Sequence, residues 1–592
     1  MAAAMAWTFW PDPWLVEPPD PDSQLRLVRL RDLIAGQAWF DGTQYRIGGE
    51  GGLAMHWSRS VDAPMLALLS AGNLLFGPGS GERLVMFAWP LGLFLAFILM
   101  ALGLARRLEN SDALLPAAVL AVLNIDILTH FIPGRLDHHN VQLVLLLVLL
   151  FGLTGDRDDR RGGIVAGLAL AAMLAVAMEA LPYALATGLL LPLRWAFDGR
   201  DGPDRRFAAF GLSLAAALAI LYVTTVPDGG AAYCDAFSAV YLSIGMIGGI
   251  GVAVLSVAAA GKPPSVRLAG LAGLAGIILA LAALAFPDCL RGPSGAVSSE
   301  LQEGWMDTVA EAQPIWSYAA VFPVGALTSF AAPLLAIAAA AVRVFRNSTV
   351  EPTARWRWIC ALAFLVTALL VSVYQYRGTP FLNALSVPVL AVWIAEWRAR
   401  AEAGLGGLLR TLAVLGVWLA GLQVSYLTLG NGITVLAKRL PGQPVATSAP
   451  VDGPGIRLAE PGATKAEREC VDPASAAALE ALPEDRVLAP LFFGPTVLTL
   501  SRHAALAGPY HRAETAILDT LRAGSGTPDD ARDVIRRHKI GYVVVCPTSR
   551  EALLMVQEQD SGLFVDLMKG RTFPGLDVVD APGSYLQIYR VR

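Results

Sequence analysis

Charged residues are scarce in this chain. They make up 16% of its 592 residues, whereas an ordinary soluble domain contains about 25%. Hydrophobic residues account for 55% of the sequence, and the mean hydropathy is +0.53. This composition excludes an ordinary soluble protein and indicates a polytopic membrane protein.

Other common signals are also missing. The net charge of −4 and the pI near 6.0 provide no basic excess, so we expect no nucleic-acid partner. The apolar start at Met1–Trp10 lacks a basic flank and runs into Pro11-Asp12-Pro13, so we expect no cleavable signal peptide. A glycine-rich phosphate loop is absent too.

Apolar runs of roughly 16–25 residues recur along the first three quarters of the chain and predict about twelve to thirteen membrane-spanning helices. The expected fold is therefore mainly α. The candidate spans are 84–105, 113–130, 140–155, 163–178, 181–195, 207–226, 240–260, 267–286, 317–342, 357–375, 380–397 and 407–428.

Basic residues orient these spans, because they gather in alternate loops. Examples are Arg106-Arg107, Arg160-Arg161 and Arg205-Arg206. Such loops face the cytoplasm by the positive-inside rule. The opposite loops are 35–80, 131–140, 227–239, 287–316 and 374–379. We expect these loops, and everything after about residue 430, to face the periplasm or the cell exterior of a bacterial inner membrane.

The end of the chain changes character. Residues 440–461 are rich in proline and glycine and predict a linker, and a mixed α/β pattern follows. Thr527-Pro528-Asp529-Asp530 predicts a helix start, while Gly541–Val545 and Tyr585–Val591 predict strands. The predicted organisation is an N-terminal segment with the first external loop (1–83), a transmembrane domain (84–428), a linker (429–475) and a periplasmic α/β domain (476–592).

Five cysteines are present. Cys360 lies in a predicted span, whereas the other four lie on the predicted outer side, where an oxidising compartment permits disulfides. We expect the pairs Cys470–Cys546 and Cys234–Cys289. The alternative, that these cysteines are free and buried, stays open because their geometry is not visible in the sequence.

Four predicted outer segments carry polar residues that a passive membrane protein does not need. They are Phe40–Arg46 followed by His56–Arg59, Asp137-His138-His139, Thr308–Pro314, and Tyr374–Arg377. A carboxylate and two imidazoles at a membrane boundary are costly, so they indicate a functional site. They are also ligand types for a divalent cation.

Each segment also has a simpler interpretation. Asp41 could be a turn residue, and Asp137 could cap the helix that begins near Asn140. Glu311 could be a solvated loop acid, and Arg377 could extend towards lipid headgroups. Taken together these interpretations weaken, because three carboxylates on one face repel one another unless a cation or a basic ligand joins them.

Three of the motifs, in this order, resemble those of the oligosaccharyltransferase catalytic subunits, which are GT-C membrane glycosyltransferases. Phe40-Asp41-x-x-x-Tyr45-Arg46 resembles the motif of their first external loop. Asp137-His138-His139 is similar to their second acidic motif, especially its archaeal form. Thr308-Val309-Ala310-Glu311 with Gln313-Pro314 is similar to the motif near the end of their long external loop.

The resemblance implies roles for individual residues. It implies Asp41, Asp137 and Glu311 as catalytic residues, and these three with His139 as ligands of Mg²⁺ or Mn²⁺. It places Arg377, Tyr376 and His138 near the phosphate of the donor. We expect the acceptor side to include His56, Arg46, His511 and Arg512. Glu179 lacks a clear motif and is equally compatible with supporting the site or facing a cavity.

Two departures from the family are apparent. The Trp-Trp-Asp-Tyr-Gly signature that recognises an acceptor peptide is absent, and Leu491–Leu498 stands in its expected region. Peptide N-glycosylation is therefore doubtful. The family motif that contains Asp41 normally follows a transmembrane helix, whereas Met1–Trp10 is too short to span a membrane, so we expect an incomplete start or an interfacial segment.

The resulting hypothesis is a monomeric, inverting glycosyltransferase. It would move a sugar or oligosaccharide from a polyprenyl phosphate or pyrophosphate to a lipid, glycan or protein acceptor at the outer face. Two alternatives stay open. A transporter or flippase of lipid-linked glycans would carry charges near the midplane, and a glycan ligase or polymerase would act without a metal.

Overall fold

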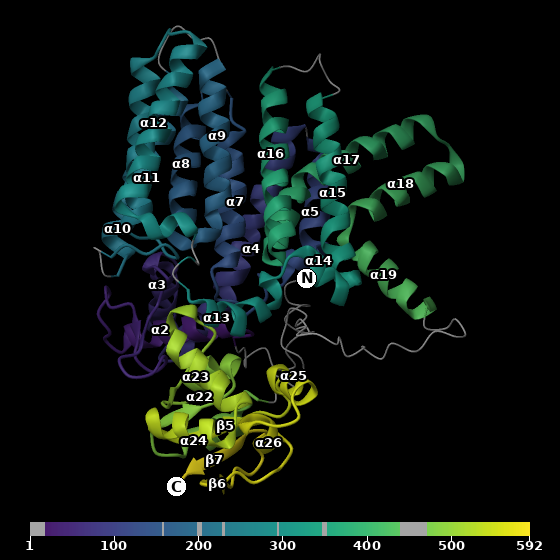
Figure 1. The fold of residues 1–592 in the computed structure, drawn as a ribbon. Coiled ribbons are helices and arrows are strands. Elements are labelled where there is room, and N and C mark those ends of the chain that lie inside the picture. The colour runs from purple at the N-terminus through teal and green to yellow at the C-terminus, as the bar shows by residue number, and fades with distance from the viewer. Residues whose placement is uncertain are drawn as a thin grey trace.

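The computed structural model describes residues 18–592 except 110, 157–158, 198–203, 228–230, 293–294, 296, 346–351 and 438–469. A helical bundle occupies one end of the molecule, and an α/β domain occupies the other (Figure 1). The predicted apolar start at Met1–Trp10 and the predicted proline-rich linker lie outside the described residues.

In the described part of the chain, eight helical segments are long and apolar enough to cross a membrane. They contain α4 (Ser80–Leu108), α9 (Leu181–Phe197), α10 (Arg205–Thr225), α11 (Ala239–Ala258), α12 (Pro264–Ala285), α15 (Pro323–Phe345), α16 (Pro352–Tyr374) and α17 (Thr379–Gly404). Helices α18 (Gly407–Gly421) and α19 (Gln423–Ala437) add a ninth span if they count as one, although they meet at 90°. The chain is a multi-pass membrane protein.

Helices occur at all twelve expected spans, but among the described residues eight of them, or nine with the bent pair, are long and apolar enough to cross a membrane. Three predicted spans correspond to shorter helices, namely α5 (Leu114–Leu123) with α6 (Ile125–Leu128), α7 (His139–Leu153) and α8 (Arg160–Val176). Asn124 separates α5 from α6, because its backbone is extended and its side chain caps α6. Helix α7 has 15 residues, and so extends about 22 Å, less than the roughly 30 Å hydrocarbon core.

Of these shorter helices, α7 is largely buried inside the bundle. One face of α7 packs against α4 and α8, and Leu143, Leu146 and Leu147 are fully buried there. Helix α17 is central, since nearly every residue from Thr379 to Val392 is buried. Helices α18 and α19 extend away from the bundle (Figure 1).

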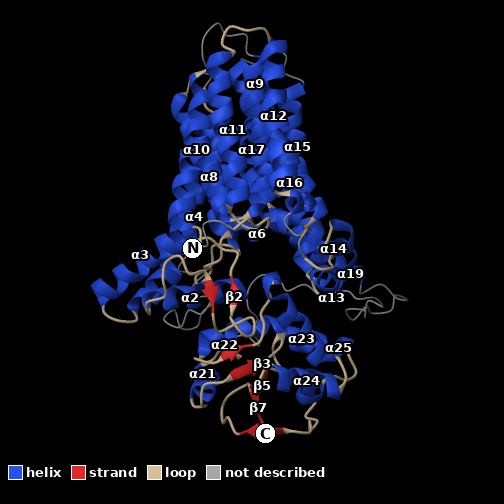
Figure 2. Cartoon of the chain, turned by 60° about the vertical axis from the view of Figure 1, so that its left-hand side comes forward, coloured by secondary structure: helices blue, strands red, loops and turns tan. Residues whose placement is uncertain are grey.

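The loops separate to the two ends of the bundle, as the pattern of basic residues predicts. Arg206 donates hydrogen bonds to the carbonyls of Gly152, Leu153 and Gly155, and Arg357 donates to the carbonyl of Arg107. These contacts gather the basic loops at one end. The polar loops gather at the other end, next to the α/β domain (Figure 2).

The α/β domain contains a five-stranded mixed sheet in the order β4-β3-β5-β7-β6. Its strands are β3 (Arg486–Leu488), β4 (Ala504–Ala505), β5 (Ile540–Val545), β6 (Leu576–Val579) and β7 (Gln587–Val591). Its helices are α21 (Pro473–Glu480), α22 (Gly494–Leu500), α23 (Glu514–Ser525), α24 (Pro528–Arg537), α25 (Arg550–Glu558) and α26 (Leu563–Met568). The predicted start of α24 is confirmed, because Thr527 and Asp530 form a reciprocal capping box.

The N-terminal segment packs against this domain. It contains α2 (Pro21–Ile34), the short hairpin β1 (Thr43–Gln44) and β2 (Leu53–Ala54), and α3 (Arg59–Phe76). Leu25, Val28 and Ile47 are buried in the same apolar core as Val487 and Val544 of the sheet. The first external loop and the α/β domain thus form one packed unit.

Both expected disulfides are confirmed. Cys470 pairs with Cys546 inside the α/β domain, and Cys234 pairs with Cys289. The second bond ties the loop before α11 to the start of the long loop after α12. Cys360 is free and buried.

Candidate functional site

Asp137 lies in the turn between α6 and α7, at the polar end of the bundle, with 1% of its side chain exposed. Its Oδ1 accepts a hydrogen bond from the His139 amide at 3.1 Å, so it does help to start α7. Its Oδ2 has other partners. This oxygen lies 2.6 Å from Nη2 of Arg135 and 3.1 Å from Nδ1 of His139.

Glu179 closes the site from the turn before α9. Its Oε1 lies 3.3 Å from Nε2 of His139, and its Oε2 lies 3.8 Å from Nε2 of His138. The ring of His130 lies 5.3 Å from that of His139. His139 therefore stands between two carboxylates that come from different turns of the chain.

The ionisable side chains of this cluster have pKa values that are shifted in different directions. Burial opposes ionisation of Asp137, but Arg135 and His139 outweigh it and hold the pKa of Asp137 well below its usual value. Burial likewise opposes protonation of His139, yet Glu179 and Asp137 raise its pKa well above the usual value. Burial and the charge of His139 lower the pKa of His138 to about 4, so that ring is neutral.

Glu311 and Arg377 form an ion pair beside this cluster. Arg377 donates to Oε1 of Glu311 at 2.7 Å, and their side chains are 36% and 56% exposed. The charge of Arg377, followed by that of His139, lowers the pKa of Glu311. Tyr376 points elsewhere, because its hydroxyl is 2.8 Å from Oγ of Ser329 in α15.

Asp41 is held in a turn of its own. Its carboxylate accepts hydrogen bonds of 3.0 Å from the Thr43 amide and from the Tyr45 hydroxyl. Three groups of possible metal ligands occur among the described residues, and neither Asp41 nor Glu311 belongs to one. Their assignment as ligands remains a prediction.

A buried arginine cluster supports the segments that contain Asp41 and His138. Arg26, Arg29 and Arg59 all contact Asp62, at 2.6, 2.9 and 3.0 Å. Burial opposes ionisation of Asp62, but the three guanidinium groups outweigh it and lower its pKa to about 2.

This arginine cluster reaches the site in two places. Arg59 donates to the backbone carbonyls of Trp39 and Asp41, which fixes the turn that carries Asp41. The guanidinium of Arg26 lies 4.3 Å from the ring of Trp57, and that ring lies 6.5 Å from His138.

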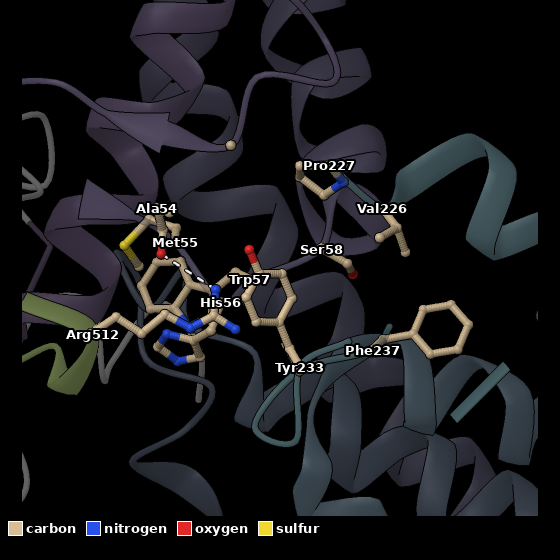
Figure 3. A pocket seen from close by; sticks show the side chains of 12 residues that line it. Ala54, Met55, His56, Trp57, Ser58, Val226, Pro227, Tyr233, Phe237 and Arg512 are labelled. Carbon is tan, nitrogen blue, oxygen red and sulfur yellow. Dashed lines mark hydrogen bonds between the residues drawn. The ribbon is translucent and has the colours of Figure 1, made fainter. Parts of the chain in front are cut away.

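The residues expected on the acceptor side separate into two places. His56, His511 and Arg512 gather around Asp235 of the loop before α11 (Figure 3 shows His56 and Arg512). Arg46 instead donates to backbone carbonyls of the α/β domain, including that of Ser501 at 2.8 Å. It fastens the hairpin to that domain.

The residues present fit a divalent cation. Asp137, His139 and His130 form one ligand group, and His138, His139 and Glu179 form another, with ligand atoms within 4.8 Å of one another. Oε2 of Glu179 and Nδ1 of His138 are buried and have no hydrogen-bond partner among the described residues. Carboxylate and imidazole groups with unused lone pairs are ligand types for a divalent cation.

Sequence reasoning did not assign three contributors to this region. Glu179 had no motif, His130 lies in an apolar stretch, and Asp22 lies on α2, far away along the chain. Burial, together with the carboxylates of Asp20 and Asp137, raises the pKa of Asp22 to about 7. The available signal in the sequence was the rarity of histidine, since the chain contains only seven histidines.

No protein-family model and no curated protein matches this chain. Solved structures do match it. Archaeal oligosaccharyltransferase AglB from Archaeoglobus fulgidus, in complex with an inhibitory peptide and a dolichol-phosphate, superimposes with a TM-score of 0.63 at 16% identity, covering 100% of this chain and 73% of that one.

Two further structures of the Archaeoglobus fulgidus oligosaccharyltransferase agree. One is tethered with an acceptor peptide and has a TM-score of 0.59 at 15% identity, covering 100% of this chain and 73% of that one. The other contains Zn and sulfate and has a TM-score of 0.55 at 14% identity, covering 100% and 72%. The chain therefore has the fold of the archaeal oligosaccharyltransferase, a GT-C membrane glycosyltransferase.

Proposed function

We propose that this protein is a membrane glycosyltransferase that takes a sugar or oligosaccharide from a polyprenyl phosphate or pyrophosphate. The observation that carries the proposal is the cluster of Asp137, His139 and Glu179 at the polar end of the bundle, beside the Glu311–Arg377 pair. The shared fold supports it, since the archaeal enzyme was solved with dolichol-phosphate and with an acceptor peptide.

Different side chains of this protein would perform the separate parts of the reaction. A lipid donor keeps its tail in the bilayer and presents its phosphate at the interface, where Arg377 and the neutral ring of His138 can bind phosphate oxygens. Asp41, whose carboxylate is partly exposed, would orient an acceptor hydroxyl and take its proton. Asp137, His139 and Glu179 would hold Mg²⁺ or Mn²⁺, which when bound offsets charge on the leaving phosphate.

The sidedness and the acceptor are also proposed. We infer that the α/β domain faces the periplasm of a bacterial inner membrane, because the opposite end carries the basic loops. The acceptor is a lipid, a glycan or an unusual protein. In place of the family's peptide-binding signature, Leu491–Leu498 lies in η7 (Leu491–Phe493) and α22, and its Leu491, Val497 and Leu498 are in the apolar core.

The test measures transfer from the lipids that co-purify with the protein, identified first by mass spectrometry. We expect Asp41→Ala, Asp137→Ala and Glu311→Ala to abolish transfer while leaving the fold intact. Asp519→Ala is the matched control, since Asp519 is also buried and paired with an arginine and a histidine in the α/β domain. Near-normal transfer by all three site variants would overturn the assignment.

The transporter alternative finds less support. The described acids and histidines that form ligand groups lie at the polar end of the bundle, rather than around its midplane. Uptake of a lipid-linked glycan into sealed vesicles, with no product formed, would favour that alternative. Transfer that survives EDTA would favour a ligase or polymerase that needs no metal.

A further inference from the structure

A second cluster of ligand-type side chains also lies near Trp57, whose ring is 5.7 Å from that of His56 and 6.5 Å from that of His138. His56 follows β2, Asp235 lies in the loop before α11, and His511 begins η8 (His511–Ala513), just before α23. One ligand atom from each lies within 4.8 Å of the other two. Segments that are remote in the sequence thus bring two imidazoles and a carboxylate together.

The contacts within this cluster are close. Nε2 of His511 lies 2.8 Å from Oδ2 of Asp235, and the rings of His56 and His511 are 5.0 Å apart. Nδ1 of His56 is buried and has no hydrogen-bond partner among the described residues. Burial, with the nearby His511 and Arg512, lowers the pKa of His56 well below its usual value.

Arg512 holds the Asp235 carboxylate in a fixed orientation. Its Nε and Nη2 donate to the two oxygens of Asp235, each at 2.7 Å. Such an outer partner orients a metal ligand. Its positive charge also disfavours a hard cation, so the imidazoles must supply most of the affinity. This favours zinc, which binds imidazole strongly, over magnesium.

A small cavity adjoins the cluster (Figure 3). Its volume is about 20 Å³, and its lining includes His56, Trp57, Tyr233 and Arg512. That volume accommodates about one water molecule. Three protein ligands with room for one water match the ligand number of an open, four-coordinate zinc site.

We propose that His56, Asp235 and His511 form a second divalent-cation site, of zinc type, at the junction of the membrane bundle and the α/β domain. The ion joins the hairpin segment, the loop before α11 and the α/β domain. It is separate from the cation expected at Asp137, because the two ligand groups share no residue. The same chain provides a matched comparison, because Nε2 of His538 lies 2.7 Å from Oδ2 of Asp519, which also pairs with Arg537. That trio lacks a second imidazole.

The test uses the full chain in detergent, stripped with EDTA and then titrated with Zn²⁺ alone in the presence of excess Mg²⁺. Elemental analysis after equilibrium dialysis counts zinc per polypeptide. We expect the wild type and Asp519→Asn to retain one more zinc ion per polypeptide than His56→Gln and His511→Gln. In His56→Gln and His511→Gln the affinity should fall by more than about 100-fold, beyond the 10–100-fold typical of losing an outer partner.

Two outcomes overturn the proposal. One is equal zinc content in the wild type, His56→Gln and His511→Gln, and the other is loss of zinc only in Asp137→Asn. If His56→Gln fails to fold, the more exposed His511→Gln decides. X-ray absorption at the zinc edge gives an independent result: two imidazoles in the wild type and one in His511→Gln support the site, and a shell without imidazole contradicts it.

Discussion

Five of the seven histidines of this chain gather within a few side chains of Trp57. They are His56, His130, His138, His139 and His511. Such a concentration has no structural necessity, because leucine or phenylalanine would fill the same volume without burying polar nitrogens. At the residue scale, these imidazoles and the acids beside them are therefore the side chains to which we assign the proposed reaction.

Glu179 should be indispensable although no motif marks it. Glu179→Gln keeps the volume but removes the charge that faces His139 at 3.3 Å. We expect Mn²⁺ affinity to fall by at least about tenfold, the lower end of the cost of losing an outer partner. Isothermal titration with Mn²⁺ measures it, with Asp519→Asn as the control. Unchanged affinity would remove Glu179 from the site.

Cation binding should tighten as the pH rises from 6 to 8. At pH 6 the Asp22 carboxyl, with its pKa near 7, and the His139 ring, with its raised pKa, both hold protons. A cation must displace or repel these protons, so its binding releases them and is weaker in acid. Titrations with Mn²⁺ should show a gain of about tenfold over this range. Asp22→Asn should flatten the slope, and tighter binding at pH 6 than at pH 8 would contradict the account.

At the scale of elements, the sequence predicts helix starts and strands well, and it predicts interruptions of helices poorly. The capping box at Thr527 and strand β5 could be predicted, because they depend on neighbours in the sequence. Hydropathy windows cannot register a break such as that at Asn124, nor the 90° bend between α18 and α19. Three of the expected spans therefore correspond to helices that are shorter than expected.

The site prediction was incomplete for a similar reason, because the sequence does not show which elements pack against one another. Asp137 and His139 are neighbours in the sequence, and their motif was recognisable. Glu179 meets them only because η2 (Met178–Ala180) packs beside the start of α7, and nothing local encodes that contact.

The disulfide within the α/β domain should stabilise its sheet. The bond between Cys470 and Cys546 spans 76 residues and adjoins the end of β5. Closing a loop of that length contributes about 2–4 kcal/mol, largely by restricting the unfolded chain. Hydrogen exchange of the β5 and β7 amides in Cys470→Ser/Cys546→Ser should report a loss of about that size. Identical protection in the double variant and the wild type would contradict this.

At the scale of the whole molecule, the account requires two chemically different ends. The basic loops are joined to one another through Arg206 and Arg357, and the opposite end is joined to the α/β domain through Asp235 and Arg512. The hairpin segment and the sheet share a core, so the outer loop and the α/β domain should act as one rigid wall of the site.

This arrangement predicts the sidedness of labelling. The positions of Asp529→Cys in the α/β domain and Arg161→Cys in the basic first turn of α8 are both well exposed. In intact spheroplasts, a membrane-impermeant maleimide should label the first and reach the second only after permeabilisation. Labelling in the reverse order would place the α/β domain in the cytoplasm.

The central claim is that acids and imidazoles at the polar end of the bundle hold a cation next to a lipid-linked phosphate. Electron–nuclear double resonance on the Mn²⁺-loaded protein tests it directly. We predict a nitrogen coupling that disappears in His139→Gln, and a phosphorus coupling that develops when a polyprenyl phosphate is added. A spectrum of fully hydrated Mn²⁺, unchanged by the lipid and by the substitution, would contradict the account.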